Sequence, residues 1–167
     1  MKLLNSIILI ISCAAFTLAI IVFCNSKKMV YVDTNLLFVG FKMTTEQDIE
    51  IKKIEEKKQT VMDSLLTQLK NVQTGLIKLE EQQLTLLKKD YMNKSARFSE
   101  EIKKLKQATT DKIWKQINQY VTEYGKENNI DIIFGANGQG SLMYAKENVN
   151  HTEVVIKYIN EKYSGAK

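Results

Sequence analysis

A long stretch of helix-forming sequence, from Thr44 to Asn128, constrains the fold more than any other feature. The whole chain lacks proline, and this stretch has one interior glycine, Gly75, with Gly125 near its end. It is dense in lysine, glutamate, glutamine and leucine, which all favour helices. Because the span is far longer than an ordinary globular helix, it predicts either a coiled coil or a helical hairpin.

Two series of apolar residues, spaced by three and four positions, support the coiled coil. Lys58 and Gln83 fill two positions of the first series. Its successive four-residue steps at Val61, Leu65 and Leu69 predict a stutter, which would locally relax the supercoil. The first series is Ile51, Ile54, Val61, Leu65, Leu69, Val72, Leu76, Leu79 and Leu86, and the second is Phe98, Ile102, Leu105, Ile113, Ile117, Val121 and Tyr124.

If the two series fold back on each other, we expect the tip of the hairpin at residues 86–95, LLKKDYMNKS. There the apolar pattern becomes ambiguous, near the midpoint of the span. Each arm would contain about 40 residues and extend about 60 Å at 1.5 Å per residue. Gly75 is the competing position, but a bend there would leave very unequal arms. We therefore interpret Gly75 as an interior helix residue that costs about 1 kcal/mol.

The segments that flank this hairpin supply the other predicted elements. Strands are expected at residues 29–34, 130–134 and 141–145, from their alternating or β-branched sequences. Residues 150–163 predict a helix, capped by Thr152 or Asn150, and Asn150 with Glu153 has the spacing of a capping box.

These elements define the expected domain organisation. Residues 29–43 and 129–164 would form one discontinuous, β-rich body, from which residues 44–128 project as the helical hairpin. The predicted class is α+β, mainly α. Three strands and one helix make a thin core, so we expect the chain to form oligomers.

The glycine-rich stretch IDIIFGANGQGSLMY, residues 130–144, could in principle hold a phosphate. A phosphate-binding loop needs a lysine and a following helix, and the dinucleotide fingerprint needs a different glycine spacing. Asn137-Gly138 is instead a favoured dipeptide for a turn between two paired strands. We therefore interpret this stretch as a β-hairpin.

The N-terminal segment, residues 3–24, contains no charge and is long enough to cross a bilayer as a helix. We favour an uncleaved anchor within residues 1–25. A cleaved signal peptide is the alternative, as is a faint lipoprotein-like sequence at Cys13, but cleavage there would leave an exposed apolar end. Lysines lie on both sides of the segment, so they do not settle its orientation. Cys13 and Cys24, the only cysteines, both fall inside it.

Charge and reactive residues argue against nucleic-acid binding and catalysis. The excess charge beyond residue 25 is carried almost entirely by lysine, and Arg97 is the only arginine, whereas sequence-specific readers of DNA favour arginine. His151, the only histidine, is expected at the surface and has no cysteine or second histidine to share a metal with. Asp33 is expected to cap a helix rather than act as a base. We expect no enzyme activity and no cofactor.

The sequences VYVDTNLLFVGF and YGKENNIDIIFGANGQGSLMYAKENVNHTEVVIKYINEKY, with the long charged hairpin between them, resemble the Skp/OmpH family of periplasmic chaperones. The likeness is greatest to membrane-anchored members from Bacteroidetes-type bacteria. His151 departs from it, because the family often has an apolar residue there. The resemblance implies a homotrimer whose helical arms surround unfolded outer-membrane β-barrel proteins in the periplasm, without ATP. Retention of residues 3–24 would tether this chain to the inner membrane.

The resemblance also implies which residues carry the function. The tip of the hairpin would contact clients, although several of its apolar residues could simply close the tip. The client-contacting residues would be Leu86, Leu87, Lys88, Lys89, Tyr91, Met92, Lys94, Arg97 and Phe98. The residues of the trimer body would be Val30, Tyr31, Val32, Ile132, Ile133, Phe134, Leu142, Met143 and Tyr144.

Two other classes remain open. One is a structural coiled-coil subunit of a cell-envelope complex, which would grip a single folded partner. The other is a membrane-tethered enzyme or nucleotide-binding regulator built on the glycine-rich stretch.

Overall fold

The computed structural model describes residues 16–17 and 27–165. Its elements begin with strand β1 (Met29–Asp33) and helix α2 (Thr34–Gly40). The long helices α3 (Lys42–Gln73) and α4 (Glu81–Glu127) follow. Strand β2 (Ile132–Ala136), the 3-10 turn η1 (Glu147–Val149) and helix α5 (Thr152–Tyr163) complete the order. The expected α+β, mainly α class with a long helical hairpin on a small body is confirmed.

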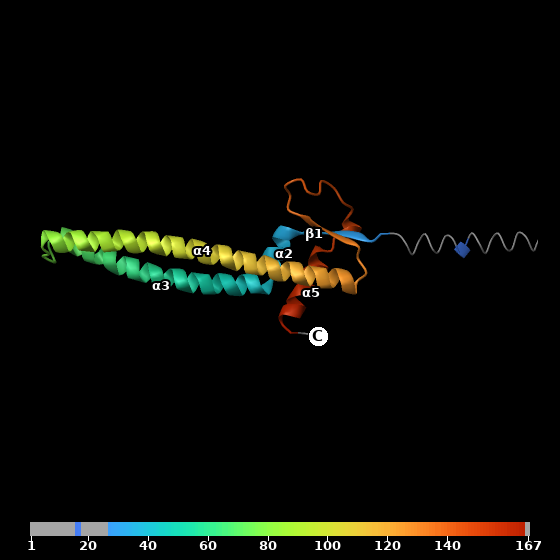
Figure 1. Cartoon of the computed structure of the whole chain (residues 1–167), viewed down its shortest axis with the longest axis horizontal. Helices are drawn as coiled ribbons and strands as arrows, with labels where there is room; N and C mark the ends of the chain where they lie inside the picture. Colours follow the sequence, from blue (N-terminus) through green and yellow to red (C-terminus); the bar gives the residue numbers. More distant parts are fainter. Residues whose placement is uncertain (1–15, 18–26, 166–167) are drawn as a thin grey trace, which may run out of the picture.

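Helices α3 and α4 lie side by side and project from the body as an antiparallel hairpin (Figure 1). The tip lies at residues 74–80, so the prediction of a tip at residues 86–95 is wrong. Gly75, with φ of 74°, lies in this turn directly after α3. Glu80 and Gln83 then form a capping box that starts α4. The arms are indeed unequal, at 32 and 47 residues, because α4 continues past the start of α3 into the body.

The seam of α3 differs from the predicted series at two positions. Glu55 and Met62 are partly buried against α4, whereas Ile54 and Val61 are 37% and 42% exposed. The seam therefore alternates regular steps of four and three, and the predicted stutter is absent from it. Its members are Ile51, Glu55, Lys58, Met62, Leu65, Leu69 and Val72.

Charged residues occupy this seam because α4 pairs with both of them. The Lys58 ammonium forms an ion pair with Glu101, and the Glu55 carboxylate lies 2.6 Å from Nζ of Lys106. Lys58 also lies above the ring of Phe98, 4.1 Å from its centroid. Lysine and glutamate can thus place their aliphatic stems in the seam while their charged ends stay paired at its edge.

The sheet has two parallel strands among the described residues. β1 pairs with β2 in a register that joins Met29 to Ile132 and Asp33 to Ala136. The first predicted strand is confirmed, and the second is found two residues later than expected. The predicted strand at 141–145 is not formed, so the interpretation of residues 130–144 as a β-hairpin is wrong. The α3–α4 hairpin instead serves as the crossover that parallel strands require.

The body core forms where α2, α4 and α5 meet beneath β1. Phe41, which joins α2 to α3, is fully buried between the rings of Tyr163 and Tyr120, at centroid distances of 5.3 and 6.3 Å. Asp33 caps α2 as expected, accepting hydrogen bonds from the backbone N–H groups of Asn35 and Leu36. The other fully buried side chains are Leu37, Ile113, Ile117, Val155 and Ile159.

The predicted anchor at residues 3–24 lies outside the described residues apart from 16–17. Of the helices that are described, none combines the length and the apolar character needed to cross a membrane.

Candidate functional site

The residues predicted to build a trimer body divide into three groups by exposure. Val30 and Val32 are 4% and 3% exposed and belong to the core of their own chain. Met143 and Tyr144, by contrast, are 88% and 80% exposed, on the loop that follows β2. The side chains available to another molecule are therefore those of the loop, together with Ile132 and Phe134 on β2. Tyr31, Ile133 and Leu142 are partly buried.

A shallow apolar groove lies between α2 and α5. Its volume is about 560 Å³, and Leu36, Val39 and Val154 on its walls are all more than half exposed. Gly40 adjoins Ile156 so closely that an added Cβ would lie 3.1 Å from its side chain. Carboxylates of Glu147 and Glu153 lie at its rim. Sequence reasoning missed this groove, because α2 and α5, which form its walls, lie far apart in the sequence.

The residues predicted to contact clients lie in the first turns of α4 rather than at the tip. They alternate between the seam and the solvent, since Leu87, Tyr91 and Phe98 are partly buried against α3 while Leu86 and Met92 are well exposed. The basic residues also differ, because some are exposed and others form ion pairs. Lys88 and Lys89 are exposed, whereas Lys94 binds Asp90 at 2.8 Å and Arg97 lies 3.5 Å from Glu101.

The turn itself carries apolar residues, of which Leu76 and Leu79 were predicted to belong to a helical seam. Leu76 is 77% exposed, and Ile77 and Leu79 are also exposed. The signal that could have located them is Gly75, since a glycine that follows polar residues and precedes three closely spaced apolar ones is typical of a helix end. The outer face of α3 adds Ile54 and Val61 to this exposed apolar surface.

Half-way along the arm, a second shallow groove of about 520 Å³ opens between the two helices. Met62, Phe98 and Ile102 supply apolar walls, and Lys58 and Glu55 supply charge. The groove lies at the position of the charged seam residues. It offers a further apolar contact surface on the arm.

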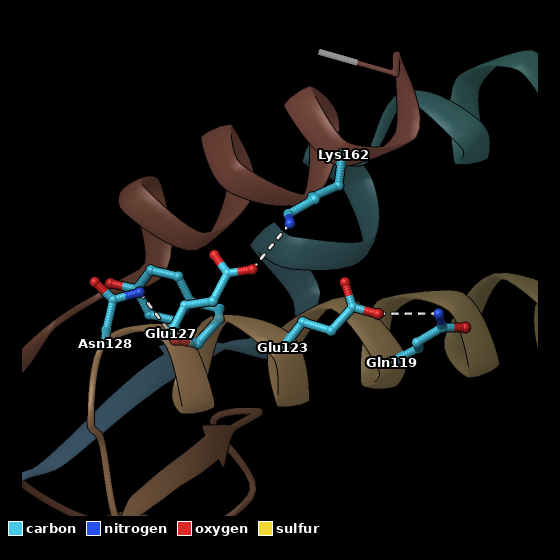
Figure 2. Close-up of polar contacts among 6 residues, drawn as sticks. Gln119, Glu123, Glu127, Asn128 and Lys162 are labelled. Carbon is cyan, nitrogen blue, oxygen red and sulfur yellow. Dashed lines mark hydrogen bonds and ion pairs between the residues drawn. The ribbon is translucent and has the colours of Figure 1, made fainter. Parts of the chain in front are cut away.

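Polar contacts fasten the C-terminal helix to the base of the arm (Figure 2). Nζ of Lys162 on α5 lies 2.9 Å from a carboxylate oxygen of Glu127 on α4, and this contact lowers the pKa of Glu127 and raises that of Lys162. Asn128 donates a hydrogen bond to the carbonyl of Tyr124 where α4 ends. Gln119 donates to Glu123 on the same helix. The Lys162–Glu127 contact joins α5 to α4, whereas the other two contacts are local to α4 and its C-terminal end.

His151 was expected at the surface, but the structure places it half-buried in the body. Its Nδ1 lies 2.8 Å from the hydroxyl of Tyr124, and its backbone N–H donates to the carbonyl of Tyr31. Burial lowers the pKa of His151, and the positive charge of Lys28 adds to the effect. Burial also raises the pKa of the Tyr124 hydroxyl.

The glycine-rich stretch folds as a turn without a phosphate cradle. The Asn137 side chain accepts from the backbone N–H of Gln139, and Gly138 and Gly140 adopt φ of 74° and 95°. An extended segment rather than a helix follows, so no helix N-terminus faces the turn. Among the residues that the structure describes, no three His, Cys, Asp or Glu side chains are grouped to hold a metal.

The described residues thus define a class of protein with two exposed apolar surfaces, one on the body and one on the arm, each with a shallow groove. The family model of OmpH-like outer membrane proteins matches residues 28–159, and this chain therefore belongs to the OmpH-like family.

Similarity to known structures agrees with the fold. The chain resembles the crystal structure of a protein provisionally assigned as an outer membrane chaperone (OmpH-like) from Caulobacter crescentus, with a TM-score of 0.54 at 11% sequence identity. The match covers 81% of this chain and 85% of that one. A comparison with curated protein sequences finds no significant match.

Proposed function

We propose that this protein is an ATP-independent chaperone that holds unfolded outer-membrane β-barrel proteins in the periplasm and prevents their aggregation. Its membership of the OmpH-like family and the chaperone assignment of the similar Caulobacter protein support a chaperone role in general. The observation that carries the finer proposal is the distribution of exposed apolar side chains along the arm and its tip.

A chaperone of this kind needs many weak and reversible contacts rather than one deep pocket. The tip presents Leu76, Ile77 and Leu79, and the outer face of α3 presents Ile54 and Val61. Each contact is small, but an unfolded chain can meet several of them at once, and the combined affinity rises without any specific sequence being read. The arm surface therefore suits partners that share exposed apolar segments and little else.

Charge gives this surface a second means of attraction. Between Lys70 and Arg97 the chain carries six basic and three acidic residues, an excess of three positive charges. Exposed lysines such as Lys88 and Lys89 would draw in acidic unfolded chains over about 8 Å at physiological ionic strength. They would also keep neighbouring arms apart.

We further propose that the chain acts as a homo-oligomer, with three copies as the family resemblance implies. A two-stranded sheet with one short terminal helix is a thin core, and the body leaves Met143, Tyr144, Ile132 and Phe134 exposed. Several arms held around a common body would enclose a client from more than one side.

We also propose that residues 3–24 tether the chaperone to the inner membrane. An uncharged apolar segment of this length, without a convincing cleavage site, motivates the proposal. Protease added to spheroplasts should then digest the C-terminal part of the chain. Complete protection of that part from the added protease would contradict a periplasmic location.

The test of the chaperone function uses light scattering. An unfolded outer-membrane β-barrel protein is diluted from denaturant into buffer with or without residues 26–167, after circular dichroism has shown that this fragment is folded. Suppressed scattering without nucleotide is the expected result. If the folded, oligomeric fragment fails to suppress scattering, the structural coiled-coil subunit of an envelope complex becomes the better proposal.

A further inference from the structure

The groove between α2 and α5 has walls that none of the described residues of its own chain covers. Leu36 and Val39 on α2 face Val154 and Ile156 on α5 across a cavity of about 560 Å³. Val39 is 72% exposed, which is unusual for an aliphatic side chain on the wall of a preformed groove. Such a surface marks a contact with another molecule.

The loop after β2 projects from the body, whereas the groove is hollow, and both surfaces are apolar. Met143 and Tyr144 project from it almost fully exposed. No backbone N–H group from Leu142 to Ala145 donates a hydrogen bond within the described part of the chain. In Figure 1 this loop rises from the body on the side away from α5. A methionine and a tyrosine held on one projecting loop are typical anchors for a pocket in a partner.

The charges at the two surfaces are complementary. Lys146 lies two residues after the anchor Tyr144, and Glu147 and Glu153 are among the residues that line the groove. Apolar anchors can therefore enter the groove while the adjacent lysine meets an acidic rim, which is the arrangement of an apolar interface centre with a polar edge.

The loop of the same chain is badly placed to fill this groove. Its last anchor, Tyr144, is only three residues from Glu147, which belongs to the rim itself. Its first residue, Ser141, is held against β2 by a hydrogen bond from its hydroxyl to the carbonyl of Gly135 at 3.2 Å. Both ends are thus fixed, and the anchors stay exposed rather than packing on their own chain. The occupant that fits is a second copy of the chain.

We propose that the Met143–Tyr144 loop of one copy docks into the α2–α5 groove of the next. This contact joins two different surfaces, so every copy offers one loop and one groove, and a closed ring fills every groove. The inference rests on the proposed oligomer and names the two surfaces that build it. It extends the trimer body to Leu36, Val39, Val154 and Ile156, which sequence analysis did not assign.

Cysteine cross-linking in the full-length chain tests the contact. In a background with Cys13→Ser and Cys24→Ser, one tagged chain carries Val39→Cys and a differently tagged chain carries Tyr144→Cys. Both are expressed together, and isolated membranes are oxidised. The expected product is a disulfide-linked species that contains both tags. Asn93→Cys, an exposed position on the arm, replaces Tyr144→Cys in the control pair and should give no such product.

The mass of the assembly provides the second measurement. Met143→Asp in the full-length chain should shift the detergent-solubilised oligomer to the monomer mass. Met92→Asp makes the same change at an exposed methionine on the arm and should leave the oligomer intact.

An intact Met143→Asp oligomer without the two-tag product would overturn the inference and leave the proposed chaperone function standing. Cross-linking of the groove cysteine to client chains in place of the second copy would also overturn it. A cross-linked oligomer that fails to suppress client aggregation would instead count against the chaperone and support the contact.

Discussion

The hydroxyl of Tyr124, near the end of α4, lies 2.8 Å from Nδ1 of His151 at the start of α5. The histidine backbone also bonds to Tyr31 on β1, so one residue joins three elements of the body. His151 is the only histidine of the chain. No other side chain of ordinary pKa changes its charge between about pH 5 and 8, so a change of stability in that range can be assigned to His151.

We expect the body to lose stability as the pH falls through the range of about 7 to 5. Burial lowers the pKa of His151 below its usual 6.5, so the unfolded chain binds the proton more readily than the folded one. The contribution of the neutral histidine is therefore complete above the unfolded pKa and disappears as the pH drops past the folded pKa. Denaturation midpoints measured across this range test the effect. His151→Gln should flatten the curve, and an unchanged slope in that variant would contradict the assignment.

Gly75→Ala should destabilise the hairpin by about 1 kcal/mol, because the residue has φ of 74°. No atom lies within 4 Å of the added Cβ, so the effect comes from the backbone alone. An interior helix position would give the opposite sign, since alanine is the better helix former there by about 1 kcal/mol. Chemical denaturation of the two chains therefore distinguishes a tip at residues 74–80 from one at 86–95.

Neighbouring residues on α3 should respond very differently to truncation. Met62→Ala should cost about 1–2 kcal/mol because its side chain lies in the seam against Phe98 and Ile102. Val61→Ala should stay within about 0.5 kcal/mol because Val61 faces solvent. Equal losses of thermal stability in the two variants would show that the seam is wrongly assigned.

Apolar residues of the tip should contribute to client binding and should contribute little to the stability of the fold. A double change of Leu76→Ser and Leu79→Ser should weaken the suppression of client aggregation several-fold while leaving the denaturation midpoint nearly unchanged, because both side chains are exposed. Thr67→Ser, on the arm outside the apolar surface, is the control. Full suppression of client aggregation by the double variant would show that clients bind elsewhere than at the tip.

Salt should weaken client binding if the lysines contribute as proposed. Raising the salt from about 0.05 to 0.5 M shortens the screening length from more than 10 Å to less than 5 Å. Lys88→Gln with Lys89→Gln should lower affinity at low salt and reduce the salt dependence, as measured by fluorescence titration with a labelled client. If client affinity does not change with salt in either chain, electrostatic attraction does not contribute to binding.

Strong periodic patterns made much of the fold predictable. The second apolar series, from Phe98 to Tyr124, lies along the buried face of α4 as expected, and Asp33 caps α2. The first series failed at Ile54 and Val61 because Glu55, which pairs with Lys106 of α4, and Met62 occupy those positions of the seam. No pattern within α3 alone carries that information.

Local rules also failed where distant segments decide the structure. Asn137-Gly138 does form a turn, but β2 pairs with β1 rather than with residues 141–145, because the hairpin brings β1 and β2 together. His151 was expected at the surface because its partner Tyr124 lies 27 residues earlier in the chain. The candidate site was less predictable than the fold. Its grooves arise between elements, and sequence spacing does not reveal such spaces.

The parallel pairing of β1 with β2 dictates the order in which the chain can fold. The backbone N–H of Lys28 donates to the Asp131 carboxylate across a separation of 103 residues, and closing so long a loop directly is slow and entropically costly. If α3 and α4 zip together from the tip first, they carry the two ends toward each other and shorten the effective loop to a few residues. During synthesis β1 must therefore wait, unpaired, until the whole arm and β2 have left the ribosome. Pairing of α3 with α4 in the arm thus brings together the two strands of the body that supports it.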